Sequence, residues 1–179
     1  MSQTKPRGAA IPSESSIASI YGKTHLADAF AIDLPEGTAR DPELLARFVF
    51  SRRPRWVAVL MAARDALVSP LGLKTGRALG SERRGPARVG IFKLYEAGTL
   101  EAVVGEDDKH LDFRASVLYR PGAAGPATLT LSTVVHCHNK LGRAYIAAIA
   151  PFHRLVVRSF LRQAAKAGWP REAAASARS

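Results

Sequence analysis

Between residues 89 and 138 the chain alternates strand-like stretches with very short connections, and this pattern restricts the fold more than any other feature. The connections at 96–98, 106–109 and 121–125 have room only for tight turns. Parallel strands would need crossovers of about a dozen residues or more, so these strands are predicted to pair antiparallel. The predicted strands are Val89–Tyr95, Thr99–Gly105, His110–Tyr119 and Thr128–His138.

The period changes to that of a helix after residue 142. Apolar residues recur at three- and four-residue spacing through Gly142–Ala167, which predicts an amphipathic helix. The predicted core side holds Tyr145, Ile149, Phe152, Val156 and Ser159, and the opposite side holds Arg143, Arg154, Arg158 and Arg162. Pro151 lies inside this segment and favours a kink in the helix.

The first half of the chain supplies one more strand and two short helices. His25–Leu34 is predicted to be a strand. Asp41-Pro42-Glu43 is a helix start, because it combines a capping residue, a proline at the first helical position and an acid in the first turn. A second helix is predicted from Pro54 to about residue 68, followed by a loop at 74–88. The predicted class is α+β, with a curved antiparallel sheet wrapped around a long C-terminal helix.

The domain organisation follows from length and from the composition of the two ends. A chain of 179 residues is expected to form a single domain. Residues 1–20 mix Pro, Gly, Ser and Lys without periodicity and are expected to be a disordered arm. The domain is expected at 21–167, and residues 168–179, which begin with Gly168-Trp169-Pro170, are expected to be a frayed tail.

The pattern of apolar residues also predicts how neighbouring strands align. Matching apolar positions places Leu94 opposite Leu100, Ala102 opposite Phe113, and Leu111 opposite Val135. One sheet face is then apolar and faces the helix, with Cys137 on that side. The opposite face would bring together Lys93, Glu101 and Arg114, and it would also hold Asp112, His110, His136 and His138.

Two interpretations of that polar face stay open. The first is a solvated ladder of opposite charges, in which each pair contributes a few tenths of a kcal/mol. The alternative is a metal site formed by His110, His136 and His138, since an H-x-H pair directs two imidazoles to one face of a strand. The same outer face is also a candidate surface for a homodimer. No cofactor is expected.

The composition points to a reducing compartment. The single cysteine excludes an internal disulfide. The amino terminus contains no apolar signal segment, and the longest apolar run, Ala144–Phe152, is too short to span a membrane. A cytoplasmic protein without a membrane partner is therefore predicted.

The net charge of +11 raises the question of a nucleic-acid partner. The basic residues are dispersed over the amino terminus, residues 52–55, the loop at 74–88 and the last helix. Five of the fifteen acids lie between Glu101 and Asp112. This distribution favours a basic surface beside an acidic patch, so nucleic-acid binding is retained only as a minority hypothesis.

A pocket between the sheet and the last helix is the main candidate site. The residues expected to line it are Trp56, Phe92, Phe113, Thr133, Tyr145, Phe152 and His153. They could hold a small apolar ligand, or they could fill a fully packed core. His153 and Tyr145 are candidates for acid–base chemistry if the protein is an enzyme of hydrolase or cyclase type.

Four groups of residues, taken in order, resemble the DUF2867 family of mostly bacterial proteins over residues 21–167. They are Ala27-Asp28-Ala29-Phe30; Trp56-Val57 with Arg64-Asp65 and Leu71-Gly72-Leu73; Glu101 with the stretch from Gly105 to Arg114; and His138 to Tyr145 with Pro151-Phe152-His153-Arg154. The last group is also similar to the closing helix of the SRPBCC, or START-like, superfamily. The resemblance implies a helix-grip fold holding an apolar ligand between sheet and helix, and it carries over no catalytic residue.

Overall fold

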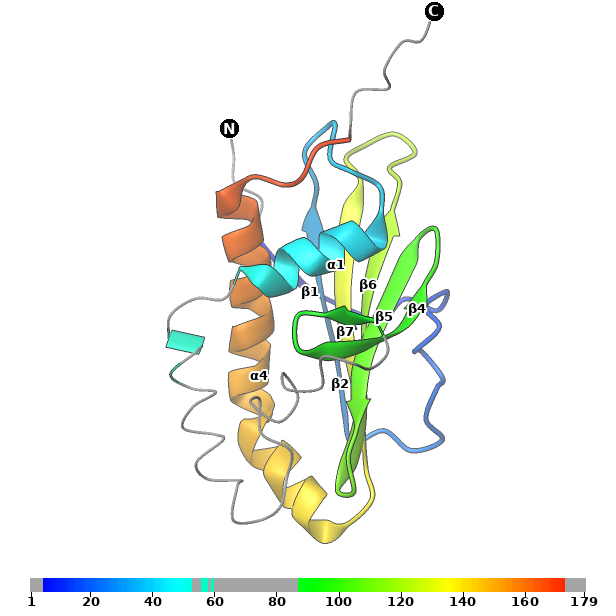
Figure 1. Cartoon of the computed structure of the whole chain (residues 1–179), viewed down its shortest axis with the longest axis vertical. Coiled ribbons are helices and arrows are strands. Elements are labelled where there is room, and N and C mark those ends of the chain that lie inside the picture. The colour runs from blue at the N-terminus through cyan, green and yellow to red at the C-terminus, as the bar shows by residue number, and fades with distance from the viewer. Residues whose placement is uncertain (1–4, 53–55, 58, 60–86, 173–179) are drawn as a thin grey trace, which may run out of the picture.

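The computed structural model describes residues 5–52, 56, 57, 59 and 87–172. Within them, the strands form one seven-stranded antiparallel sheet with the order β1-β2-β7-β6-β5-β4-β3 (Figure 1). The strands are β1 (Arg7–Ala9), β2 (Leu26–Asp33), β3 (Arg88–Val89), β4 (Phe92–Ala97), β5 (Glu101–Asp107), β6 (Leu111–Arg120) and β7 (Thr128–Cys137). The antiparallel sheet predicted from the short connections is confirmed.

Two helices, α1 (Pro42–Ser51) and α4 (Lys140–Ala167), each begin directly after a capping residue. Asp41 accepts hydrogen bonds from the backbone nitrogens of Glu43 and Leu44 at the start of α1. Asn139 accepts one from the nitrogen of Gly142, at 2.9 Å, at the start of α4. The predicted second helix, apart from residues 56, 57 and 59, and the predicted loop up to residue 86 lie outside the described residues.

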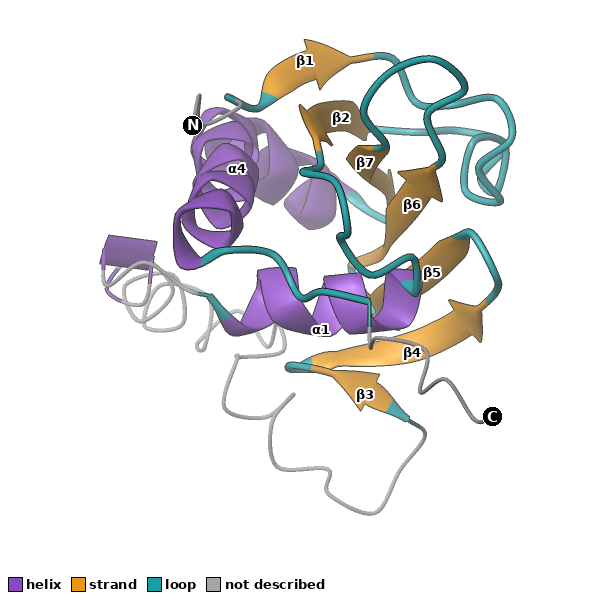
Figure 2. Ribbon diagram, turned by 90° about the horizontal axis from the view of Figure 1, so that it is seen from above, coloured by secondary structure: helices purple, strands orange, loops and turns teal. Residues whose placement is uncertain are grey.

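Both helices lie on the same side of the sheet, which curves around them (Figure 2). The larger hydrophobic cluster joins α1, α4 and the middle of the sheet, through residues such as Leu45, Leu129 and Leu161. A smaller cluster joins the first turns of α4 to the far end of the sheet, through Leu26 and Ile146, and it buries Cys137. The inner face of the sheet is apolar, as the alternation predicts.

The predicted strand alignment is wrong, although the faces are right. Leu94 lies opposite Val104 rather than Leu100, and Ala102 lies opposite Val117 rather than Phe113. Leu111 lies opposite Cys137 rather than Val135. Each shift is an even number of residues. Apolar alternation has a period of two, so it fits all such alignments equally well.

The shifted alignment gives the predicted charge ladder different partners. Glu101 lies opposite Leu118 and contacts neither Lys93 nor Arg114 as an ion pair. Lys93 instead pairs with Glu106 at 2.9 Å, and Arg114 pairs with Asp107 at 2.8 Å.

The amino-terminal segment is ordered from residue 5, in contrast to the expected arm. Strand β1 pairs with the edge of β2. Ile17 is buried against Val103 and Val134 on the outer face of the sheet. The buried Glu101 accepts hydrogen bonds from the hydroxyl groups of Ser15 and Ser116 and from the backbone nitrogen of Ser16. Part of the face considered for a dimer is thus covered by the chain itself.

The C-terminal tail is also anchored as far as residue 172. Gly168 ends α4 with a φ of 80°, a conformation that favours glycine. Trp169 is buried against Phe48, with ring centroids 5.9 Å apart. Backbone hydrogen bonds then join Pro170 to Ala39 and Glu172 to Gly37. The aromatic contact supplies the apolar burial that a frayed tail would lack.

Helix α4 continues through Pro151, and its yellow amino-terminal part is inclined to the rest in Figure 1. Its buried residues are Gly142, Ile146, Val157, Leu161 and Ala164. The predicted core side differs from this set, and Phe152 is 51% exposed. Apolar residues occur around most of this helix, so spacing alone does not define its buried side.

Candidate functional site

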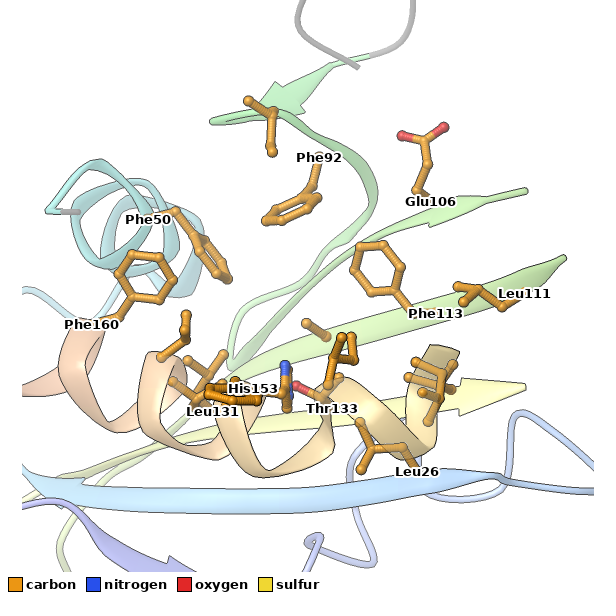
Figure 3. Close-up of a pocket in the computed structure, with 18 of the residues that line it drawn as sticks. Leu26, Phe50, Phe92, Glu106, Leu111, Phe113, Leu131, Thr133, His153 and Phe160 are labelled. Atoms are coloured by element: carbon orange, nitrogen blue, oxygen red, sulfur yellow. The ribbon is translucent and has the colours of Figure 1, made fainter. Parts of the chain in front are cut away.

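A cavity of about 290 Å³ lies between the inner face of the sheet and α4, at the junction of the two hydrophobic clusters. Phe50 of α1 and Phe92 of β4 lie toward one end, and Leu26 of β2 and Leu111 of β6 toward the other (Figure 3). Most of the other lining side chains are aliphatic or aromatic. The cavity therefore offers an apolar space with few hydrogen-bonding groups.

Helix α4 contributes a stripe of residues to this cavity. Tyr145, Ile149, Phe152 and Val156 line it. These are four of the five residues that the sequence assigns to the core side of the helix. Their apolar pattern reflects a cavity wall rather than a packed interface.

Six of the seven predicted pocket residues are brought together by the fold. They are Phe92, Phe113, Thr133, Tyr145, Phe152 and His153. Trp56 is 45% exposed and is not among the lining residues, whereas its neighbour Val57 is buried and lines the cavity.

The lining residues that were not predicted as pocket residues include Leu26, Phe50, Leu131 and Phe160. The alternation within β2 and β7 could have identified Leu26 and Leu131. The position of Phe50 depends on how α1 lies across the sheet.

One wall of the cavity is a chain of aromatic rings. The rings of Phe92 and Phe113 meet edge to face with centroids 5.3 Å apart. Phe50 contacts Phe92 at 5.6 Å and Phe160 at 6.1 Å in similar geometry. Edge-to-face pairs leave ring faces available to a further aromatic group, so this wall suits a flat aromatic molecule.

A polar group interrupts the apolar lining beside α4. Nε2 of His153 lies 3.4 Å from Oδ1 of Asp28, and Nε of Arg154 lies 3.9 Å from Oδ2. The Asp28 side chain is only 8% exposed, and its oxygens accept no hydrogen bond from the described residues. Asp28 is opposite Thr133 on β7, and Figure 3 shows Thr133 beside His153 at the cavity wall. Asp28, His153 and Thr133 together form a polar group at the cavity wall, the polar pole.

Two carboxylates, those of Glu106 and Asp108, line the cavity. Glu106 is buried, with Lys93 at 2.9 Å and Arg88 at 3.7 Å. Asp108 follows in the β5–β6 turn, where its nitrogen donates to the carboxylate of Asp112. Glu106 thus lies within an ion-pair network.

The outer-face histidines are placed differently from the proposed metal set. His136 and His138 contact each other, with ring centroids 5.2 Å apart, and His138 lies 3.1 Å from Asp112. Nδ1 of His110 instead lies 2.9 Å from the side-chain nitrogen of Asn139. Across the described ranges, no cluster of three or more His, Cys, Asp or Glu side chains is arranged to hold a metal ion.

Two further predictions concern a basic surface and a membrane span. Most of the basic cluster at 52–55 and the basic residues of the predicted loop up to residue 86 lie outside the described residues. Among the helices that the structure describes, α4 is long and apolar enough to cross a membrane by length and composition alone. This is weak evidence for a span, because core helices of soluble proteins meet the same criteria, and α4 packs on the sheet through Ile146, Val157 and Leu161.

The chain was compared with protein families, curated proteins and solved structures. No curated protein and no solved structure matches. The family model described as a protein of unknown function (DUF2867) matches residues 20–160. That range contains β2 to β7, α1 and most of α4, and with them every residue that lines the cavity. The chain therefore belongs to the DUF2867 family.

Proposed function

We propose that this protein binds a small, largely apolar molecule in the cavity between the sheet and α4. The observation that supports this is a volume of about 290 Å³ lined mainly by aliphatic and aromatic side chains. Packed interiors leave few voids larger than a water molecule. An engineered cavity of roughly 150 Å³ already admits benzene, so this cavity has room for a molecule of two fused rings.

The arrangement of elements supports a wider relationship, which we also propose. An antiparallel sheet curves around a long C-terminal helix, as in the helix-grip fold of the SRPBCC, or START-like, superfamily. In that fold the space between sheet and helix is the common ligand site. We propose a cytoplasmic location for the protein on the same basis as the sequence prediction.

Naphthalene is a suitable probe, because it is apolar, aromatic and fluorescent. Titrating the protein and following naphthalene emission should give saturable binding. Ala115→Leu is expected to weaken binding at least tenfold, because Ala115 lines the cavity and a leucine would occupy part of it.

The matched control is Ala147→Leu on the exposed side of α4, which should leave binding unchanged. Thermal melting would verify that both variants are folded. Absence of saturable binding, or equal weakening in the two variants, would contradict the proposed function.

A further inference from the structure

An apolar ligand alone would not account for the polar pole, since it offers no hydrogen-bonding partner to Asp28 or His153. A carboxylate that is 8% exposed and accepts no hydrogen bond from the described residues is costly to bury. Among the described residues, the imidazole of His153 lies 3.4 Å from this carboxylate and the guanidinium of Arg154 lies 3.9 Å from it. Of these two, His153 lines the cavity.

We propose that His153, oriented by Asp28, accepts a hydrogen bond from a hydroxyl group of the bound molecule. The preferred occupant is then a hydroxylated aromatic compound rather than a plain hydrocarbon. This inference rests on the proposed function and names the ligand class for the same cavity.

The direction of the hydrogen bond follows from the chemistry of imidazole. Neutral imidazole carries a proton on one nitrogen and a lone pair on the other. A neighbouring carboxylate favours the proton on the nitrogen nearer to it. In His153 this nitrogen is Nε2, which lies 3.4 Å from Oδ1 of Asp28 without forming a hydrogen bond with a described residue. Nδ1 is then the acceptor, and no described residue donates a hydrogen bond to it. A hydroxyl group is the neutral donor that complements it.

The charges around the polar pole favour a neutral ligand. The guanidinium of Arg154 lies close enough to Asp28 to offset the charge of its carboxylate. Both oxygens of Asp28 are also shielded, so a cationic ligand could not reach them directly. Asp28 is therefore a positioning residue, and His153 is the group that contacts the ligand.

The aromatic wall determines the body of the ligand. The rings of Phe50, Phe92 and Phe113 line the side of the cavity away from α4 (Figure 3). A flat ring system can contact these rings while its hydroxyl group points toward His153. 2-Naphthol combines both properties within two fused rings.

The test compares 2-naphthol with naphthalene and with 2-methoxynaphthalene, which keeps the oxygen but cannot donate. Fluorescence titrations are made at mildly alkaline pH. We expect 2-naphthol to bind the unmodified protein about tenfold more tightly than either analogue, as one hydrogen bond predicts. His153→Phe should abolish that preference, so that the variant binds the three compounds with similar affinity.

Asp28 is tested by two substitutions with opposite expectations. Asp28→Leu removes the carboxylate that lies beside Nε2 of His153 and should reduce the preference for 2-naphthol. Asp28→Asn keeps an acceptor oxygen and should restore most of it. If Asp28→Leu does not fold, ¹⁵N spectra of the histidine rings in unmodified protein provide the second measurement. They should show a protonated Nε2 in His153 and a shift of Nδ1 on addition of 2-naphthol.

The outcomes separate the two proposals. If none of the three compounds binds, the proposed function fails. If all three bind with equal affinity, or if His153→Phe keeps the preference for 2-naphthol, the cavity binds ligands but the role of His153 is refuted. Protonation of Nδ1 instead of Nε2 in the ¹⁵N spectra would also refute it.

Discussion

Single residues show how strongly buried polar groups constrain this structure. Glu101 is a carboxylate on the outer face of the sheet, buried under the amino-terminal segment. Burial alone raises the pKa of Glu101. Hydrogen bonds from Ser116, Ser15 and Ser16 outweigh that effect, so the pKa is lower than its ordinary value. The ionised form is therefore the one that the folded protein stabilises.

Glu101→Gln is expected to destabilise the protein by about 1–3 kcal/mol, because an amide cannot accept hydrogen bonds at both ends. The loss should appear at neutral pH in urea unfolding followed by circular dichroism. The contribution of Glu101 is fully present above its ordinary pKa of 4.5 and is lost as pH falls through the lower folded value. The difference between the two proteins should therefore shrink in acid.

The control for Glu101 is Glu36→Gln, which changes an exposed carboxylate in a turn. It should alter the free energy of unfolding by less than about 0.5 kcal/mol. Equal effects of the two substitutions at neutral pH would show that the hydrogen bonds of Glu101 do not stabilise the fold.

At the scale of elements, the position of α4 depends on a close approach between backbones. Gly142 lies in the first turn of α4, against the strand connection that holds His110. A Cβ atom on Gly142 would lie 2.3 Å from the carbonyl oxygen of His110. Only glycine lets the helix begin so close to β6, and the start of α4 in turn places Tyr145 and Ile146 in the cavity wall.

Gly142→Ala is therefore expected to destabilise the protein, although alanine favours a helix by about 1 kcal/mol over glycine. Overpacking against backbone should outweigh that gain and cost about 1–3 kcal/mol net. Thermal or urea unfolding would measure it.

The matched control for Gly142 is Gly125→Ala, where the added carbon meets nothing within 4 Å. It should leave the midpoint of unfolding nearly unchanged. An increase in stability on Gly142→Ala would contradict the close approach.

For the whole molecule, the amino-terminal segment completes the sheet rather than trailing from it. Strand β1 covers the edge of β2, and Ile17 covers Val103 and Val134 on the outer face. Sheet edges and apolar faces left open favour association between chains. The folding of residues 5–20 onto the sheet is therefore expected to keep the protein soluble.

A chain that begins at residue 23 is expected to melt at a lower temperature and to aggregate, because β2 becomes an edge strand. Thermal melting and light scattering would measure both effects. A chain that begins at residue 5 retains every described contact and should behave like the full-length protein. Unchanged melting of the shorter chain would show that the outer face needs no cover.

The sequence by itself determined the class of the sheet, the start of α1, the presence of the long terminal helix and six of the residues that line the cavity. Those features depend on local signals, namely short connections, capping residues and periods of two or 3.6. The tertiary structure decided the strand alignment, because every even shift keeps the same apolar face. It also decided which polar groups meet. Asp28 and His153 are far apart in the chain, and no local pattern could predict that folding brings them within 3.4 Å.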